Sequence, residues 1–289
     1  MGTKQPLVVI TGPTASGKSS VAMKLASEFG GEIICADSRT VYRGMDIGTA
    51  KPTIEDQRLV PHHLLDVVDP NDRFTAADFQ HMARLAIDDI RSRGKIPFLV
   101  GGTGLYVDSV VLNYEFDSQY DPKLREQLEA MSLDQLYKYC KTNNIKLPEN
   151  SKNKRYVVRN IERNGSVVKS NNDNLSTSII VGIATEKNEL NNRIVQRTEH
   201  IFEDGVVKEA KLLGEKYGWD IPSMTGNIYP VARKVIDGEL NIQQAKEKFI
   251  IQDRRLAKRQ MTWLKRNDFI QWKSLDDVYY YIKTQLQAR

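Results

Sequence analysis

A glycine-rich segment near the amino terminus has the spacing of a phosphate-binding loop. Gly12 and Gly17 frame it and Lys18 and Ser19 follow directly, which is the Gly-x-x-x-x-Gly-Lys-Ser pattern. Glycines let successive backbone N–H groups converge on one anion, lysine adds a mobile positive charge, and a serine hydroxyl can hold Mg²⁺. The pattern predicts that a di- or triphosphate binds to Gly12, Pro13, Thr14, Ala15, Ser16, Gly17, Lys18 and Ser19.

The elements on either side of this loop have the order that it requires. Residues 7–11 form an apolar run rich in β-branched side chains, and apolar residues recur at helical spacing over 21–29. A strand, a loop and a helix are therefore predicted, with the positive end of the helix facing the phosphate. The alternative is a solvated turn that matches by chance, and the flanking elements argue against it.

Two more predicted strands end in turns that could carry chemistry. Asp37 follows the apolar run 32–35, and Gly-Gly-Thr-Gly, which includes Thr103, follows the run 96–100. Open α/β sheets place ligands beyond the carboxyl ends of their strands, so both residues are expected on the rim that holds the phosphate loop. Asp37 is a candidate for catalysis, and its alternative role is a cap or Asx-turn residue. The glycine turn by itself is also compatible with plain turn chemistry.

The alternation of strands and helices predicts an α/β fold, a P-loop NTPase-like parallel sheet flanked by helices. The alternation stops near residue 113, where short polar helical segments begin, two of them opening at Asp121 and Ser132. A buried strand returns at 177–184, and mostly helical sequence follows, including one long helix over 242–266. We predict a catalytic core of residues 1–112 and 177–289 and a small helical insertion domain of residues 113–176.

A long loop is predicted inside the core. Residues 41–53 show neither the helical nor the strand period, and Gly44, Gly48 and Pro52 punctuate them. Loops of this length within compact domains are usually functional. The pair His62 and His63 lies shortly after it, but without a third ligand at a useful spacing it gives little support for a metal site.

The composition is that of a soluble globular chain. Of 289 residues, 40% are hydrophobic and 27% charged, and no apolar run reaches the roughly 18 residues that a membrane helix needs. The chain has two cysteines, Cys35 and Cys140, and they lie far apart in the sequence without the spacing of a metal site. We therefore expect a cytoplasmic monomer without a signal peptide, disulfide framework or zinc site.

Positive charge is concentrated in two stretches. Residues 152–169 carry a net charge of +5 and residues 254–266 a net charge of +6, while the whole chain carries +5. By subtraction, the remainder is acidic by about six charges. Two basic stretches on a mildly acidic chain indicate a polyanion larger than a nucleotide, although two solvated helix faces would have the same composition.

Six segments together resemble tRNA dimethylallyltransferases, and they occur in family order over residues 7–272. They read Gly-Pro-Thr-Ala-Ser-Gly-Lys-Ser (12–19), Ala-Asp-Ser (36–38), Tyr-Arg-Gly-Met-Asp-Ile-Gly-Thr-Ala-Lys-Pro (42–52), Pro-His-His-Leu-Leu-Asp (61–66), Gly-Gly-Thr-Gly-Leu-Tyr (101–106) and Ala-Lys-Arg-Gln-Met-Thr-Trp-Leu (257–264). The resemblance implies transfer of a dimethylallyl group from dimethylallyl diphosphate to N6 of the adenosine 3′-adjacent to the anticodon. It also implies that Mg²⁺ is required, with Ser19 as a ligand.

The same resemblance implies roles for individual residues. Asp37 would be the general base, and Lys18 and Thr103 would stabilise the leaving diphosphate. Residues expected to contact tRNA are Asp37, Ser38, Arg39, Thr40, Thr103, Arg125, Arg155, Arg159, Arg254, Arg255, Lys258, Arg259 and Gln260. The flipped target base is expected to face residues 37–40.

The chain departs from the family pattern at four places that bear on tRNA recognition. Thr40 stands where the family often has glutamine, Tyr156 where it has the first arginine of a pair, and Asp253 where it usually has threonine. Residues 227–231, which include Pro230, replace a Gly-Tyr-(Arg/Lys)-Gln segment. Three other functions stay open at this point: transfer to a free nucleotide, a small-molecule kinase whose loop binds ATP, and a non-catalytic RNA-binding protein.

Overall fold

The computed structural model describes residues 5–116, 121–165, 169–171 and 175–288. Two compact units divide the chain: Met1–Leu112 with Asn172–Arg289, and Asn113–Asn171. The second unit lies within the range 113–176 that the sequence suggests for the insertion.

The first unit is built on a six-stranded sheet in which all pairs are parallel, in the order β3-β2-β4-β1-β5-β6. The strands are β1 (Leu7–Thr11), β2 (Glu32–Cys35), β3 (His62–His63), β4 (Pro97–Gly101), β5 (Ser178–Ile183) and β6 (Gln271–Lys273). All five residues of β1 are buried, as expected for a parallel strand covered on both faces. Thr11 pairs with Gly101 and Gly182, so three neighbouring strands end at one level.

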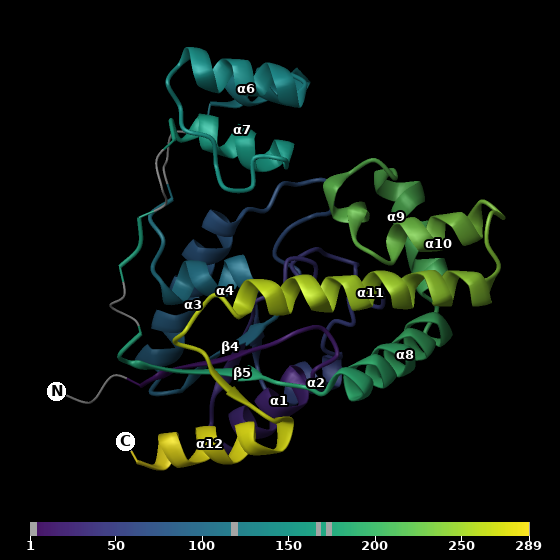
Figure 1. Ribbon diagram of the computed structural model, residues 1–289. Coiled ribbons are helices and arrows are strands. Elements are labelled where there is room, and N and C mark those ends of the chain that lie inside the picture. Colours follow the sequence, from purple (N-terminus) through teal and green to yellow (C-terminus); the bar gives the residue numbers. More distant parts are fainter. Residues whose placement is uncertain (1–4, 117–120, 166–168, 172–174, 289) are drawn as a thin grey trace. The chain divides into compact units, whose positions relative to one another are not determined.

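Helices cover both faces of the sheet (Figure 1). Val9 packs with α3 (Ala76–Ser92) and α4 (Gly104–Val111), whereas its neighbours Val8 and Ile10 pack with α1 (Lys18–Phe29) and α12 (Leu275–Gln287). This alternation follows from the two-residue period of a strand. Helix α3 begins at a capping box, in which Thr75 accepts from the backbone N–H of Asp78.

A third apolar cluster lies around the predicted long loop. Val41 and Met45 pack against side chains from helices that lie between β5 and β6 in sequence. These helices are α8 (Lys187–Glu203), α9 (Val206–Tyr217), α10 (Tyr229–Ile236) and α11 (Ile242–Leu264), with the short 3₁₀ helix η1 (Pro222–Thr225). The loop is therefore held by its own core, although it has no regular structure until α2 (Ile54–Leu59).

The predicted strands near 7–11, 32–35, 96–100 and 177–184 are confirmed, whereas the short elements α2 and β3 were not predicted. Helix α2 has six residues, none of them buried, and begins at a capping box between Thr53 and Asp56. Strand β3 has two residues. Neither is long enough to show a period in the sequence, which explains why periodicity did not reveal them.

The second unit is helical. It contains α5 (Pro122–Ala130), α6 (Leu133–Thr142) and α7 (Lys154–Glu162), packed around Leu128, Leu136, Cys140, Val157, Val158 and Ile161. Asp121 and Ser132 cap the first two helices at the positions that the sequence predicted.

A buried carboxylate fixes the start of β2, the strand that leads to Asp37. Glu32 is 2% exposed and accepts from Arg93 Nη2 at 2.8 Å, Lys95 Nζ at 2.7 Å and His63 Nε2 at 2.7 Å. The Arg93 hydrogen bond, with those of Lys95 and His63, holds the pKa of this carboxyl far below its usual range despite its burial.

We predict that Glu32→Gln lowers the free energy of unfolding by about 2–3 kcal/mol at pH 7. The pKa is depressed in the folded state, so the contribution of Glu32 is complete above the unfolded value of about 4.3 and is lost as the pH falls below it. The difference in unfolding free energy between wild type and Glu32→Gln, measured with urea from pH 7 to pH 3, should shrink as the pH falls. A difference in unfolding free energy that does not change with pH would contradict this. So would an equal loss of stability in the control Glu203→Gln, whose side chain is exposed.

Candidate active site

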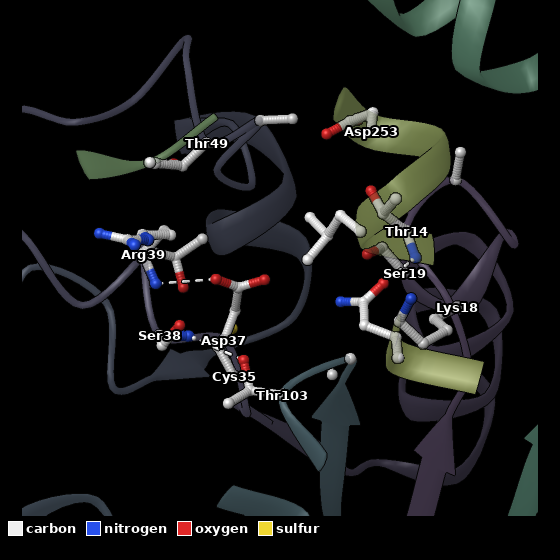
Figure 2. A pocket seen from close by; sticks show the side chains of 18 of the residues that line it. Thr14, Lys18, Ser19, Cys35, Asp37, Ser38, Arg39, Thr49, Thr103 and Asp253 are labelled. Atoms are coloured by element: carbon white, nitrogen blue, oxygen red, sulfur yellow. Dashed lines mark hydrogen bonds between the residues drawn. The ribbon is translucent and has the colours of Figure 1, made fainter. Parts of the chain in front are cut away.

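A cavity of about 570 Å³ lies at the carboxyl edge of the sheet. It is lined by the phosphate loop, residues 37–40, residues 48–50 and Pro52 of the long loop, the turn 101–103, and parts of α8 and α11. Figure 2 shows Asp37 and Ser38 on one side of this cavity and Thr14, Lys18 and Ser19 on the other. The candidate residues of three separate loops therefore face one space.

The phosphate loop has the conformation that its glycines allow. Gly17 has φ of 90° and Gly12 φ of 150°, and a Cβ at Gly12 would come within 3.3 Å of the carbonyl oxygen of Ile183. Helix α1 begins at Lys18 directly after the loop. The predicted strand, loop and helix are thus confirmed, and the amino end of α1 opens toward the cavity.

Lys18 folds back over the loop. Its Nζ donates to the carbonyl oxygen of Pro13 at 2.6 Å, and burial lowers its pKa to about 8, opposed by the carboxylate of Asp37 and assisted by Arg197. A bound anion would favour the charged form of this amine. Ser19 lines the cavity beside it.

Asp37 serves the turn and also faces the cavity. Its Oδ1 accepts from the backbone N–H of Arg39 at 2.8 Å, which is the Asx-type contact considered for this residue. The carboxylate nevertheless lines the cavity, so the turn bond orients it and does not remove it from the site.

Thr103 joins the turn 101–103 to the Asp37 turn. Its hydroxyl accepts from the backbone N–H of Ser38 at 3.1 Å, and its own N–H donates to the carbonyl oxygen of Ala36 at 3.2 Å. An accepting hydroxyl keeps its own proton to donate. The structure thus brings Asp37, Ser38 and Thr103 together at the carboxyl edge of the sheet, where the sequence placed Asp37 and Thr103.

Helix α11 crosses this edge of the sheet (Figure 1). Gln260 Oε1 accepts from the backbone N–H of Thr14 at 2.7 Å, and its amide lies against Gly102. Trp263 lies against Gly104, and its indole N–H donates to Oδ2 of the buried Asp108 at 2.6 Å. The helix is therefore docked on a glycine turn and touches the phosphate loop directly.

The basic residues predicted on α11 divide into two groups. Arg254, Arg255 and Lys258 are exposed and lie outside the cavity lining, whereas the exposed Arg259 and the half-buried Gln260 line it.

Two residues of the Asp37 turn that were predicted to face the target base have different surroundings. Thr40 is 5% exposed, and its hydroxyl has no hydrogen-bond partner in the part of the chain that the structure describes. The Arg39 guanidinium donates to the carbonyl oxygens of Pro222 and Ser223.

The three arginines predicted to bind tRNA from the second unit have different surroundings. The Arg125 side chain is 11% exposed and paired with Glu129 at 2.6 Å and Glu162 at 2.8 Å. Arg155 and Arg159 are exposed, with Arg159 3.6 Å from Glu162. The surroundings of Arg125 are those of a residue that holds α5 to α7, and tRNA contact by all three stays a prediction.

Two arginines of the site were not identified from the sequence. Arg197 Nη1 donates to the Thr14 hydroxyl, and Arg193 Nη1 donates to the carbonyl oxygen of Ser16 at 3.1 Å. They are four residues apart on α8, so one helix face carries both. That spacing is a usable signal, but the sequence does not specify that α8 lies over the phosphate loop.

Asp253 adds a buried acid to the cavity wall. Its Oδ2 lies 3.5 Å from Arg197 Nη1, and its Oδ1 accepts from Asn227 Nδ2 at 3.2 Å. Burial raises its pKa, and the negative charge of Asp37 adds to this, while Arg197 and Asn227 oppose it. Asp253 is thus a second carboxylate in the cavity wall, in addition to Asp37.

Within the described residues no group of three or more His, Cys, Asp or Glu side chains could hold a metal ion. No helix there is long and apolar enough to cross a membrane. Both cysteines are free and buried.

Sequence comparison assigns the chain to a family. A family model described as IPP transferase matches residues 40–267, and one described as isopentenyl transferase matches residues 5–65. A tRNA dimethylallyltransferase of Desulforudis audaxviator (strain MP104C) is 37% identical over 294 residues, covering 96% of this chain and 94% of its own length. The chain belongs to the tRNA dimethylallyltransferase family. The family member of Bacillus subtilis (strain 168) is 35% identical, covering 93% of this chain.

Solved structures of the family have the same fold. The tRNA isopentenylpyrophosphate transferase of Bacillus halodurans superimposes with a TM-score of 0.73 at 34% identity, covering 99% of this chain and 98% of its own. The corresponding Staphylococcus epidermidis enzyme gives a TM-score of 0.73 at 31% identity. The predicted P-loop NTPase-like fold is confirmed.

Gly104→Ala should loosen the docking of α11. A Cβ at this position would lie 2.1 Å from Cδ1 of Trp263, so the indole and the helix that carries it must shift. We expect the free energy of unfolding to fall by about 1–3 kcal/mol. Gly226→Ala is the matched control, because its nearest neighbour would be 3.6 Å away. Equal unfolding midpoints in urea for the two variants would contradict the close docking.

Proposed function

We propose that the protein transfers a dimethylallyl group from dimethylallyl diphosphate to N6 of the adenosine immediately 3′ of the anticodon in tRNA. The products are N6-(dimethylallyl)adenosine and diphosphate. The observation that carries the proposal is the single cavity shared by the phosphate loop and the Asp37 carboxylate. Relatives named tRNA dimethylallyltransferase over nearly the full length support it.

The phosphate loop would hold the diphosphate of the donor. Its backbone N–H groups, the amino end of α1 and the ammonium of Lys18 all favour an anion at this place. Arg197, on the other side of Thr14, adds a second positive charge. These groups would stabilise the charge that grows on the leaving diphosphate as the bond to carbon breaks.

Mg²⁺ fits the donor set of this site. Magnesium is commonly held by one or two protein oxygens together with substrate phosphates, and the Ser19 hydroxyl at the start of α1 is such an oxygen. When bound, the ion would neutralise charge on the diphosphate.

Asp37 would accept the proton of the attacking amine. The bond from N6 to C1 of the allyl group forms while the bond from C1 to the diphosphate oxygen breaks and its electron pair leaves with diphosphate. The N6 proton passes to the Asp37 carboxylate, which the Arg39 N–H orients. Thr103, beside Ser38, can donate its hydroxyl proton to the diphosphate.

The acceptor would be an adenine of tRNA, which the names of the relatives and the exposed basic residues of α11 support. A base inside a stack has to be flipped out to reach such a cavity, and the exposed basic residues of α11 could hold the flanking phosphates. Ser38, Arg39 and Thr40 would face the flipped base. We further infer that the protein acts as a monomer in the cytoplasm.

The proposal is tested by incubating the protein with tRNA and isotopically labelled dimethylallyl diphosphate, and in parallel with γ-labelled ATP. Label from the prenyl donor in tRNA adenosine is the expected result. Label from ATP on an acceptor, with none from the prenyl donor, would identify a kinase instead. Transfer to free AMP in preference to tRNA would identify a nucleotide-prenylating enzyme.

We predict that Asp37→Asn lowers the transfer rate by about 10²- to 10⁴-fold. Asparagine can still accept the turn bond from the Arg39 N–H, but it cannot take up the proton. Single-turnover transfer at saturating tRNA isolates this effect, because binding then does not limit the rate. A rate within a few-fold of wild type would leave Asp37 as a turn residue only.

Neutralising Lys258, Arg259 and Lys265 to glutamine should weaken tRNA binding and flatten its salt dependence. The slope of log affinity against log salt should fall by about one for each tRNA phosphate that the protein no longer neutralises. The control replaces Lys208, Lys211 and Lys216, three exposed lysines on α9, which removes the same amount of charge. Equal slopes for the two triple variants would mean that the basic face of α11 is only solvated.

A further inference from the structure

Glu209 on α9 binds three consecutive backbone N–H groups of the long loop. Oε2 accepts from Asp46 at 2.9 Å and from Ile47 at 2.7 Å, and Oε1 accepts from Gly48 at 2.9 Å. The Tyr229 hydroxyl donates to Oε1 at 3.0 Å. Successive N–H groups that converge in this way form an anion-binding concavity, here filled by a carboxylate of the same chain.

The loop is braced from its other side by a buried cation. The Lys51 side chain is 4% exposed and donates to the carbonyl oxygen of Tyr42 at 3.0 Å, to Asp46 at 2.5 Å and to Asp66 at 2.6 Å. Charge-assisted hydrogen bonds of this kind are stronger than neutral ones. An irregular segment is thus fixed by two charges of opposite sign.

The braced segment forms part of the active-site wall. Gly48, Thr49 and Ala50 line the cavity, and the carbonyl oxygen of Thr49 accepts from Arg197 Nη2 at 3.4 Å. Arg197 in turn donates to Thr14 of the phosphate loop. A continuous set of contacts therefore runs from Glu209 through residues 46–49 to the guanidinium beside the diphosphate site.

We propose that Glu209 is a positioning residue for donor binding: its carboxylate sets residues 46–49, and these set Arg197 over the phosphate loop. The proposal rests on the proposed function, in which this loop binds a diphosphate. Glu209 itself does not line the cavity, so it acts through the backbone that it holds.

Glu209→Gln tests this directly. The amide keeps the size of the side chain but replaces one accepting oxygen with an N–H₂ group that cannot accept, so the N–H groups of residues 46–48 lose part of their partner. We expect the KM for dimethylallyl diphosphate and the Kd for inorganic diphosphate with Mg²⁺ to rise about tenfold. The KM for tRNA should change less than twofold and kcat less than threefold. Glu209→Asp, which keeps the charge, should recover much of the affinity.

Glu215→Gln on the same helix is the matched control, since this exposed side chain is paired only loosely with Lys211, at 4.0 Å, and its donor KM should be that of wild type. Thermal unfolding identifies folded variants, and if Glu209→Gln does not fold, Glu209→Asp carries the test with an expected rise of two- to fivefold. An unchanged diphosphate Kd in a folded variant, or a lower kcat with both KM values unchanged, would overturn the proposal. Absence of prenyl transfer by the wild type would refute the proposed function instead, while diphosphate titration would still test Glu209.

Discussion

The site depends on the close approach of α11 to the carboxyl edge of the sheet. Gln260 and Trp263 lie where a Cβ on Gly102 or Gly104 would be, at 2.6 and 2.1 Å, and Asp108 holds the indole from α4. Because of this contact, the helix that carries the basic residues also brings a side chain to the phosphate loop through Gln260. A larger residue in the turn would separate the two halves of the cavity.

Within that frame, the charges of the cavity would suit the diphosphate of the proposed donor. Lys18 is buried and its pKa is lowered to about 8, which reflects the cost of an ammonium without a full counter-charge. Asp253 is buried near Arg197, and its pKa is raised. Lys18 lies across the cavity from Asp37 (Figure 2), and a diphosphate bound between them would favour the charged form of Lys18.

Much of this arrangement could be predicted from the sequence, and the reason is the parallel sheet. Once the phosphate loop, Asp37 and Thr103 are each assigned to the end of a strand, the topology brings them to one edge. The positions of Arg197 and Glu209 could not be predicted, because nothing in a helical pattern specifies that α8 and α9 fold back over loops that lie far earlier in the chain. For Arg125 the family motif predicts contact with tRNA, but it does not reveal the two ion pairs that hold the side chain within its own unit.

We propose that one cavity holds the leaving diphosphate on the phosphate loop and directs the allyl carbon toward Asp37. A crystal structure with Mg²⁺ and an unreactive thio analogue of dimethylallyl diphosphate would test this arrangement most directly. We expect both phosphates on the backbone N–H groups of residues 15–19, with Ser19 on the metal and C1 facing the Asp37 carboxylate. An analogue bound with its diphosphate at residues 37–40, or outside this cavity, would contradict it.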